Sequence, residues 1–184
     1  MTTPHRERVL RAATSSFLAR GYGSSIDDIA RRAGVARQTV YQHFASKDEL
    51  FKAVAGDLAK RVLVELEGED VRRSLLRFAL EYRKRALGAQ GIATFRTLVP
   101  EVPRFRALAR NVYANTAGEM VRRLAEFLQE KLEVADPEFA AEMFLSMLTG
   151  HDRLKRLFAV PRGAESEAAR TARIVDLFLK AHPS

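Results

Sequence analysis

The sequence predicts an all-α fold of about nine helices, arranged as a three-helix N-terminal domain followed by a larger helical domain. Apolar residues recur at three- and four-residue spacing in almost every segment, as on the buried face of a helix. No segment shows the strict apolar–polar alternation of a half-buried strand. Of the 184 residues, 47% are hydrophobic, which is enough for one sizeable core or for one core with a small second one.

Three N-terminal helices are predicted from their apolar faces and their end signals. The first has an apolar face formed by Val9, Leu10, Ala13 and Phe17, and Gly21 is placed to end it. Ser25 is a suitable N-cap for a second helix, which ends at Gly34. The third is short and contains RQTVYQHF, residues 37–44.

The segment Ser46-Lys47-Asp48-Glu49 has the pattern of a capping box and opens a fourth helix. Its apolar face predicts that this helix continues to about residue 66 and connects the two domains, residues 1–48 and 49–184. Further helices are predicted at about 71–86, 92–99, 105–132, 137–158 and 166–181. The fourth of these starts with Asp136 as a cap and proline at its first position.

Composition excludes several classes of site. The chain has no cysteine, so disulfides, thiolate metal sites and cysteine catalysis are excluded, and its four histidines form no metal-ligand spacing. We expect no metal and no cofactor. The charged N-terminus and the lack of a long apolar run predict a cytoplasmic protein without a membrane span. The net charge of +8 favours an anionic partner.

Residues 26–44 have the spacing of a helix-turn-helix. Ala30 is small where two helices cross, Gly34 suits a tight turn, and Val40 points into the core. The third helix must then present six polar side chains outward, with no acidic residue among them: Arg37, Gln38, Thr39, Tyr41, Gln42 and His43. Arginine can read guanine and glutamine can read adenine, while hydroxyls and imidazole can bind phosphate, so this face predicts insertion into a DNA major groove.

The run SSIDDIARRAGVARQTVYQHFASKDELF resembles the DNA-binding domain of the TetR (TetR/AcrR) family over about residues 6–60. The stretch TFRTLVPEVPRFRALARNVY is similar to the AefR-like ligand-binding subgroup of that family. The resemblance implies a ligand-responsive repressor that binds double-stranded DNA as a homodimer on a near-palindromic operator, with a small-molecule effector and a dimer interface formed by the two C-terminal helices. An activator of the same family is the nearest alternative.

The resemblance also implies individual roles. Ser25 and Thr39 would hydrogen-bond phosphates, Tyr41 and His43 would clamp the backbone, and base edges would be read by Arg37, Gln38 and Gln42. Lys47 would contact phosphate, which physical reasoning supports independently, because a cation in a first helical turn opposes the helix dipole unless an anion binds there. The family often has a hydroxyl where this chain has Ala36, so one cap or phosphate contact is expected to be missing.

The C-terminal part is less specific. Its aromatic and methionine residues are expected to be mostly core, with some lining an effector cavity; the candidates are Tyr82, Phe95, Phe105, Tyr113, Met120, Met143 and Met147. The arginine-rich segment 72–110 is interpreted as a solvated face, with an anionic-ligand mouth or steering of DNA as alternatives. His151-Asp152 is expected at a helix bend or a subunit interface.

Two other classes of protein remain as alternatives. A small all-helical enzyme needs a polar constellation in the C-terminal core, and the sequence contains none, so no catalytic residue is predicted. A polyanion-binding scaffold would bind any polyanion in a salt-sensitive manner and without sequence preference.

Overall fold

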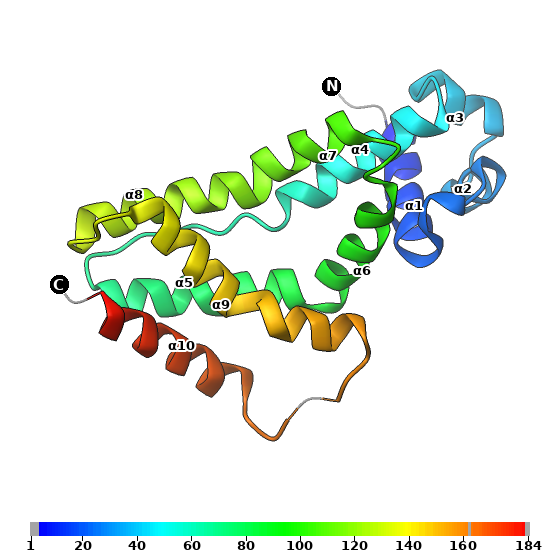
Figure 1. Ribbon diagram of the computed structural model, residues 1–184. Helices are drawn as coiled ribbons and strands as arrows, with labels where there is room; N and C mark the ends of the chain where they lie inside the picture. Colours follow the sequence, from blue (N-terminus) through cyan, green and yellow to red (C-terminus); the bar gives the residue numbers. More distant parts are fainter. Residues whose placement is uncertain (1–3, 162, 183–184) are drawn as a thin grey trace. The chain divides into compact units, whose positions relative to one another are not determined.

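The computed structural model describes residues 4–161 and 163–182, and all regular structure in these residues is helical (Figure 1). Within them α7 (Arg106–Tyr113) and α8 (Glu119–Lys131) are joined by a π-helical turn, Ala114–Gly118. The ten α-helices therefore form nine continuous helical segments, which confirms the predicted fold class, and the long helix predicted at about 105–132 is present. The chain forms two compact units, one from residues up to Arg61 with Ala93–Val112, the other from Val62–Ile92 and Tyr113 onward.

The first unit contains α1 (Pro4–Arg20), α2 (Ile26–Ala33), α3 (Arg37–His43) and α4 (Lys47–Lys60). The end of α6 (Ala89–Leu98) and most of α7 also belong to this unit. Its core combines aliphatic residues with an aromatic cluster, in which the ring of Phe51 lies 5.2 Å from that of Phe17 and 5.3 Å from that of Phe105. Residues of the later segment thus complete the core of the N-terminal helices.

Local signals set the ends of these helices as predicted. α1 ends at Arg20 and is followed by Gly21 at φ +66°, and α2 ends before Gly34 at φ +62°. Only glycine adopts this left-handed conformation without steric cost. Ser25 and Ser46 are the N-caps of α2 and α4, and each side chain accepts a hydrogen bond from the backbone N–H three residues later, at 3.1 Å.

The predicted extension of the fourth helix to about residue 66 is wrong. α4 ends at Lys60, and residues 63–68 have no helical structure. Val64 is buried in the core of the second unit, and Val62, Leu63 and Leu66 pack against it, whereas Glu65 and Glu67 are exposed. Residues at i and i+2 share one face of an extended chain but lie on opposite sides of a helix, so packing Val64 and Leu66 into one core requires the chain to leave the helix.

The second unit contains α5 (Val71–Leu87), α8, α9 (Pro137–Leu157) and α10 (Glu167–Ala181). Here α10 packs along α5 and α8 packs along α9 (Figure 1). Asp136 caps α9 and Ser166 caps α10, so the two C-terminal helices begin and end within a residue of their predicted bounds. The shared core is formed by Leu75, Phe78, Tyr82, Met120, Leu124, Leu128, Phe144, Leu148, Val175 and Phe178, among others.

Candidate nucleic-acid interface

Helix α3 presents the polar face that the sequence predicts. Val40 is buried in the core of the first unit, so the rest of this seven-residue helix lies at the surface. Arg37, Gln38, Tyr41 and Gln42 are exposed, and the two other predicted contact residues, Thr39 and His43, are half-buried. The structure therefore brings these six side chains together on one short helix, while their roles toward DNA stay predictions.

The side chain of Arg37, on α3, forms an ion pair with Asp27 in the first turn of α2. Its Nη1 lies 3.1 Å from both carboxylate oxygens of Asp27, and its guanidinium carbon lies 5.7 Å from the centre of the Tyr41 ring. Both members of the ion pair are largely exposed, so the pair contributes little to stability and can open when an anion competes for the arginine. Asp27 is thus a competitor for whatever Arg37 binds.

The predicted phosphate contacts lie at helix starts. Ser25 is exposed, and while its oxygen caps α2 its hydroxyl hydrogen can still be donated outward. Lys47 lies in the first turn of α4, with Nζ 4.3 Å from the centre of the Tyr22 ring. The N-cap of α3 is Ala36, which forms no side-chain cap, as expected from its departure from the family pattern.

An aromatic and charged cluster around Tyr22 is a feature that the sequence did not predict. The Tyr22 hydroxyl donates a hydrogen bond to Asp48, and Arg104 donates to the same carboxylate at 3.0 and 3.3 Å. The Arg104 guanidinium also lies 4.5 Å from the Tyr22 ring centre. Burial and the hydrogen bond and negative charge of Asp48 raise the pKa of Tyr22 to about 12. No local pattern identifies this cluster, because Arg104 and Asp48 are 56 residues apart.

Two family models match the chain. Residues 9–54 match the model of bacterial regulatory proteins of the tetR family, and residues 73–182 match the AefR-like transcriptional repressor C-terminal domain. The second match alone covers more than half of the chain. This chain belongs to the TetR family. Both resemblances predicted from the sequence are thereby confirmed.

Two solved structures are similar over nearly the whole chain. The flavonoid-responsive regulator FrrA is 30% identical with a TM-score of 0.72, and the match covers 97% of this chain and 96% of FrrA. A structure from Mesorhizobium loti MAFF303099 assigned to the TetR family has a TM-score of 0.82 over 98% of this chain and 99% of that one; at 22% identity it shows the fold alone.

Curated relatives match over shorter stretches. The transcriptional activator FasR of Mycolicibacterium smegmatis is 41% identical over 81 residues, which are 41% of this chain and 37% of FasR. The transcriptional repressor DhaR of Mycobacterium sp. (strain GP1) is 34% identical over 74 residues, 38% of this chain and 37% of DhaR. The chain thus spans little more than a third of the length of these two HTH-type regulators.

The predicted effector-pocket residues are distributed over both units. Phe95 and Phe105 belong to the first unit and the five others to the second. Tyr82 and Met120 are buried in the core of the second unit, and Phe105 is buried in the core of the first. The remaining four are exposed by 37–60% of their surface: Phe95, Tyr113, Met143 and Met147. Their assignment to an effector pocket stays a prediction.

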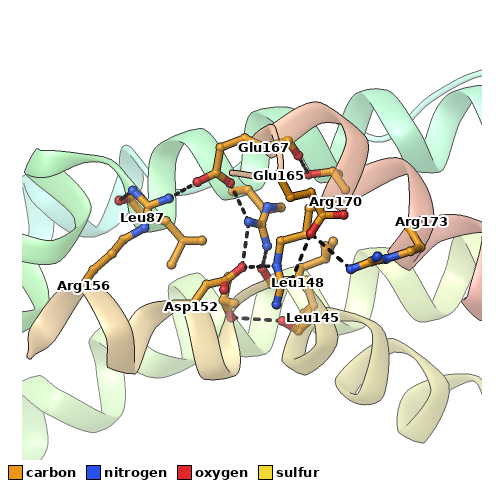
Figure 2. A network of polar contacts seen from close by, with 12 residues as sticks. Leu87, Leu145, Leu148, Asp152, Arg156, Glu165, Glu167, Arg170 and Arg173 are labelled. Atoms are coloured by element: carbon orange, nitrogen blue, oxygen red, sulfur yellow. Dashed lines mark hydrogen bonds and ion pairs between the residues drawn. The ribbon is translucent and has the colours of Figure 1, made fainter. Parts of the chain in front are cut away.

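The arginine-rich segment contains one buried cation, so its interpretation as a solvated face is wrong for Arg83. This residue is 3% exposed, because it lies on the inward face of α5 together with Tyr82 and Ala86. Arg83 donates to the Leu148 carbonyl, to Asp152 at 2.8 Å and to Glu167 at 2.6 Å; these three partners are labelled in Figure 2. These bonds join α5 to α9 and α10.

Asp152 is a structural member of this network. It accepts hydrogen bonds at 2.8 Å from both Arg83 and Arg170 (Figure 2). Burial raises the pKa of Asp152, but the hydrogen bonds and charges of the two arginines act in the opposite direction and the pKa is lowered overall. The neighbouring His151 is exposed. α9 continues through this position, so the pair lies within a continuous helix.

Metal and membrane sites can be assessed for the described residues. No cluster of three or more His, Cys, Asp or Glu in residues 4–161 and 163–182 could hold a metal ion. None of the helices in this part of the chain is long and apolar enough to cross a membrane.

Proposed function

We propose that this TetR-family chain is a ligand-responsive transcriptional repressor that binds a near-palindromic operator as a homodimer. The observation that carries this proposal is the outward face of α3, which presents cationic, amide and hydroxyl groups opposite the buried Val40. A short helix with this surface matches the hydrogen-bonding pattern of base edges and phosphates in a major groove.

Individual contacts follow from where each side chain lies. Arg37, Gln38 and Gln42 are exposed on α3 and would read base edges. The roles at the DNA backbone would fall to the hydroxyl, imidazole and ammonium groups around them, which are Ser25, Thr39, Tyr41, His43 and Lys47. Residues 1–48 would then be the DNA-binding domain, and residues 49–184 would bind the effector and dimerise.

The homodimer is supported by an exposed apolar stripe on α9. Phe139, Met143 and Met147 follow one another at four-residue spacing and are 37–59% exposed, and Leu154 and Phe158 continue the stripe beyond Gly150. Leu177 of α10 is also more than half exposed. Two copies of this stripe packed about a twofold axis would form a helical interface and would place two α3 helices on two half-sites.

Regulation would follow from linkage. A small molecule that binds better to a dimer unsuited to the operator weakens DNA binding, and DNA weakens effector binding by the same factor. Repression is the first candidate because the AefR-like repressor domain matches residues 73–182. Activation is the second candidate, favoured by the match to the activator FasR.

Fluorescence anisotropy with DNA from upstream of the chain's own gene tests the proposal. Wild type would be compared on this DNA and on a scrambled sequence at two salt concentrations, with Tyr41→Ala and Gln42→Ala as test variants. Gln129→Ala removes a glutamine that is also exposed, on α8, and is the matched control. Preference for the native sequence that persists at higher salt, and that only the α3 variants lose, is the expected result.

Equal and salt-labile binding to both sequences would have two explanations: the operator lies elsewhere in the genome, or the surface binds any polyanion. Selection from random DNA decides between these, because a scaffold without base readout would enrich no motif. Failure to enrich a motif would reject the proposed function.

A further inference from the structure

A solvent-open cavity of about 430 Å³ lies on the surface of the first unit, between α1 and the end of α2, and its arginines are exposed. Arg8, Arg11, Ala12 and Ser15 of α1 line it, together with Arg32 and Ala33 of α2. The α1 residues are spaced i, i+3, i+4 and i+7, so they form one stripe along that helix. Three guanidinium groups and one hydroxyl thus surround a floor of two alanines.

The positive charge of this cavity is only partly compensated. Arg8 donates to the Gly34 carbonyl at 3.0 Å, which fixes its position and leaves its other N–H groups available. Arg11 lies 3.8 Å from Glu7 in an exposed pair, which is weak. Arg32 forms no ion pair with a side chain in the part of the chain that the structure describes. The adjacent Arg31, by contrast, pairs with Asp28.

A position in the last turn of α2 gives Arg32 one ordinary function, because a cation there stabilises the helix dipole. That function explains neither Arg8 nor Arg11, which reach the same cavity from a different helix. Three like charges that face one cavity repel one another, and an anion would convert this repulsion into attraction.

We propose that this cavity binds a phosphate group. Three arginines with Glu7 nearby leave a charge of about +2, which matches a dianionic phosphate, and planar guanidinium groups pair with phosphate oxygens through two parallel hydrogen bonds. The Ser15 hydroxyl can donate a hydrogen bond to a further phosphate oxygen. The phosphate comes either from a free phosphorylated molecule, for which the cavity volume leaves room, or from the backbone of bound DNA. This site is separate from the α3 face; the first source does not depend on the proposed function, whereas the second rests on the proposed DNA binding.

Isothermal titration of the full chain with pyrophosphate, in a buffer without phosphate or sulfate, tests the first source. One site per chain is expected, and Arg32→Gln should weaken binding about tenfold or more, because a charge-assisted hydrogen bond is lost. Ser15→Ala should weaken it less. Arg31→Gln is the matched control: it makes the same change one residue earlier on α2, outside the cavity lining, and should leave the affinity unchanged. Circular dichroism confirms that each variant is folded.

The second source is tested with DNA. If the cavity holds a backbone phosphate, Arg32→Gln should weaken binding to operator and scrambled DNA alike. The slope of DNA affinity against salt concentration should then fall by about 0.9. In that case pyrophosphate should bind wild type no more tightly than the variant. An unchanged salt slope together with no pyrophosphate binding would overturn the proposal, as would equal losses in Arg31→Gln and Arg32→Gln. Absence of sequence-specific DNA binding by wild type would reject the proposed function but would leave the pyrophosphate result standing.

Discussion

Asp152→Asn is expected to destabilise the protein by about 2–3 kcal/mol at pH 7, because it removes a carboxylate that two arginines share. The side chain of Asp152 is 14% exposed, and its partner Arg83 is 3% exposed. The substitution keeps the size and shape of the side chain, so the change in charge dominates the effect.

The magnitude follows from the contacts that are lost and those that remain. Two hydrogen bonds of 2.8 Å to charged donors are weakened, and each such bond contributes about 1.5–3 kcal/mol. Arg83 keeps the Leu148 carbonyl and Glu167, so its charge is not left without a partner. The expected loss therefore lies below the roughly 3–5 kcal/mol of a buried pair that is broken completely.

Thermal and urea unfolding at a fixed protein concentration measure this loss, which corresponds to a decrease in Tm of about 5–10 °C. Asp176→Asn is the matched control, because that carboxylate joins α10 to α5 through Arg72 at 2.7 Å but lies at the surface. The control should leave the Tm unchanged within error. A variant of Asp152 that is as stable as this control would show that the network contributes no net stability.

The pH dependence gives an independent check. The pKa of Asp152 is lowered in the folded chain, so its carboxylate stabilises the fold above the ordinary aspartate pKa of about 3.9, and this contribution is lost as the pH falls through the folded-state pKa. The gap in stability between wild type and Asp152→Asn should therefore be constant from pH 7 to 5 and should shrink below about pH 4. A gap that stays the same down to pH 3 would refute the assignment to this carboxylate.

Further predictions concern the first unit. Ala36→Ser should supply the missing cap of α3 and raise the free energy of unfolding by about 0.5–1 kcal/mol, measured by urea unfolding; a destabilised variant would contradict this. Gly34→Ala should lower it by about 1–2 kcal/mol, since the position is left-handed and a Cβ would lie 2.7 Å from an arginine nitrogen; an unchanged midpoint would exclude strain there. Asp27→Asn should tighten DNA binding at low salt by releasing Arg37, and weaker binding in anisotropy would show that the pair orients the arginine for DNA. Lys47→Ala should weaken binding to all sequences and lower the salt slope by about one, whereas Arg37→Ala should relax base preference; the reverse pattern would exchange the two roles.

Features with local causes could be predicted from the sequence. Ser25 and Ser46 cap their helices through a backbone N–H three residues away, and Gly34 turns the chain by its own conformation. The outward face of α3 was predictable as well, because burial of Val40 determines which side of a short helix is exposed. These interactions span a few residues, so the local sequence contains all the information they need.

The end of α4 illustrates where such reasoning fails. Leu58, Val62 and Leu66 fit the pattern of a continuing helix, because they follow one another at four-residue spacing. Val64 and Leu66 also alternate with Glu65 and Glu67, and they pack into the core of the second unit from an extended segment. Whether the helical spacing or the alternating pattern prevails depends on the core surface against which the segment packs. That surface is formed by residues far away in the chain.

The sequence by itself determined the helical class, most helix ends other than that of α4, and the polar side chains of α3, because propensity, capping and amphipathic spacing act over one or two turns. Only the tertiary structure decided which charges far apart in the sequence are paired. It buries Arg83 against Asp152, holds Arg37 on Asp27, and brings Arg8 and Arg32 from two helices to one cavity. Electrostatic pairing depends on distance in space, and the folded chain brings together charges that the sequence separates.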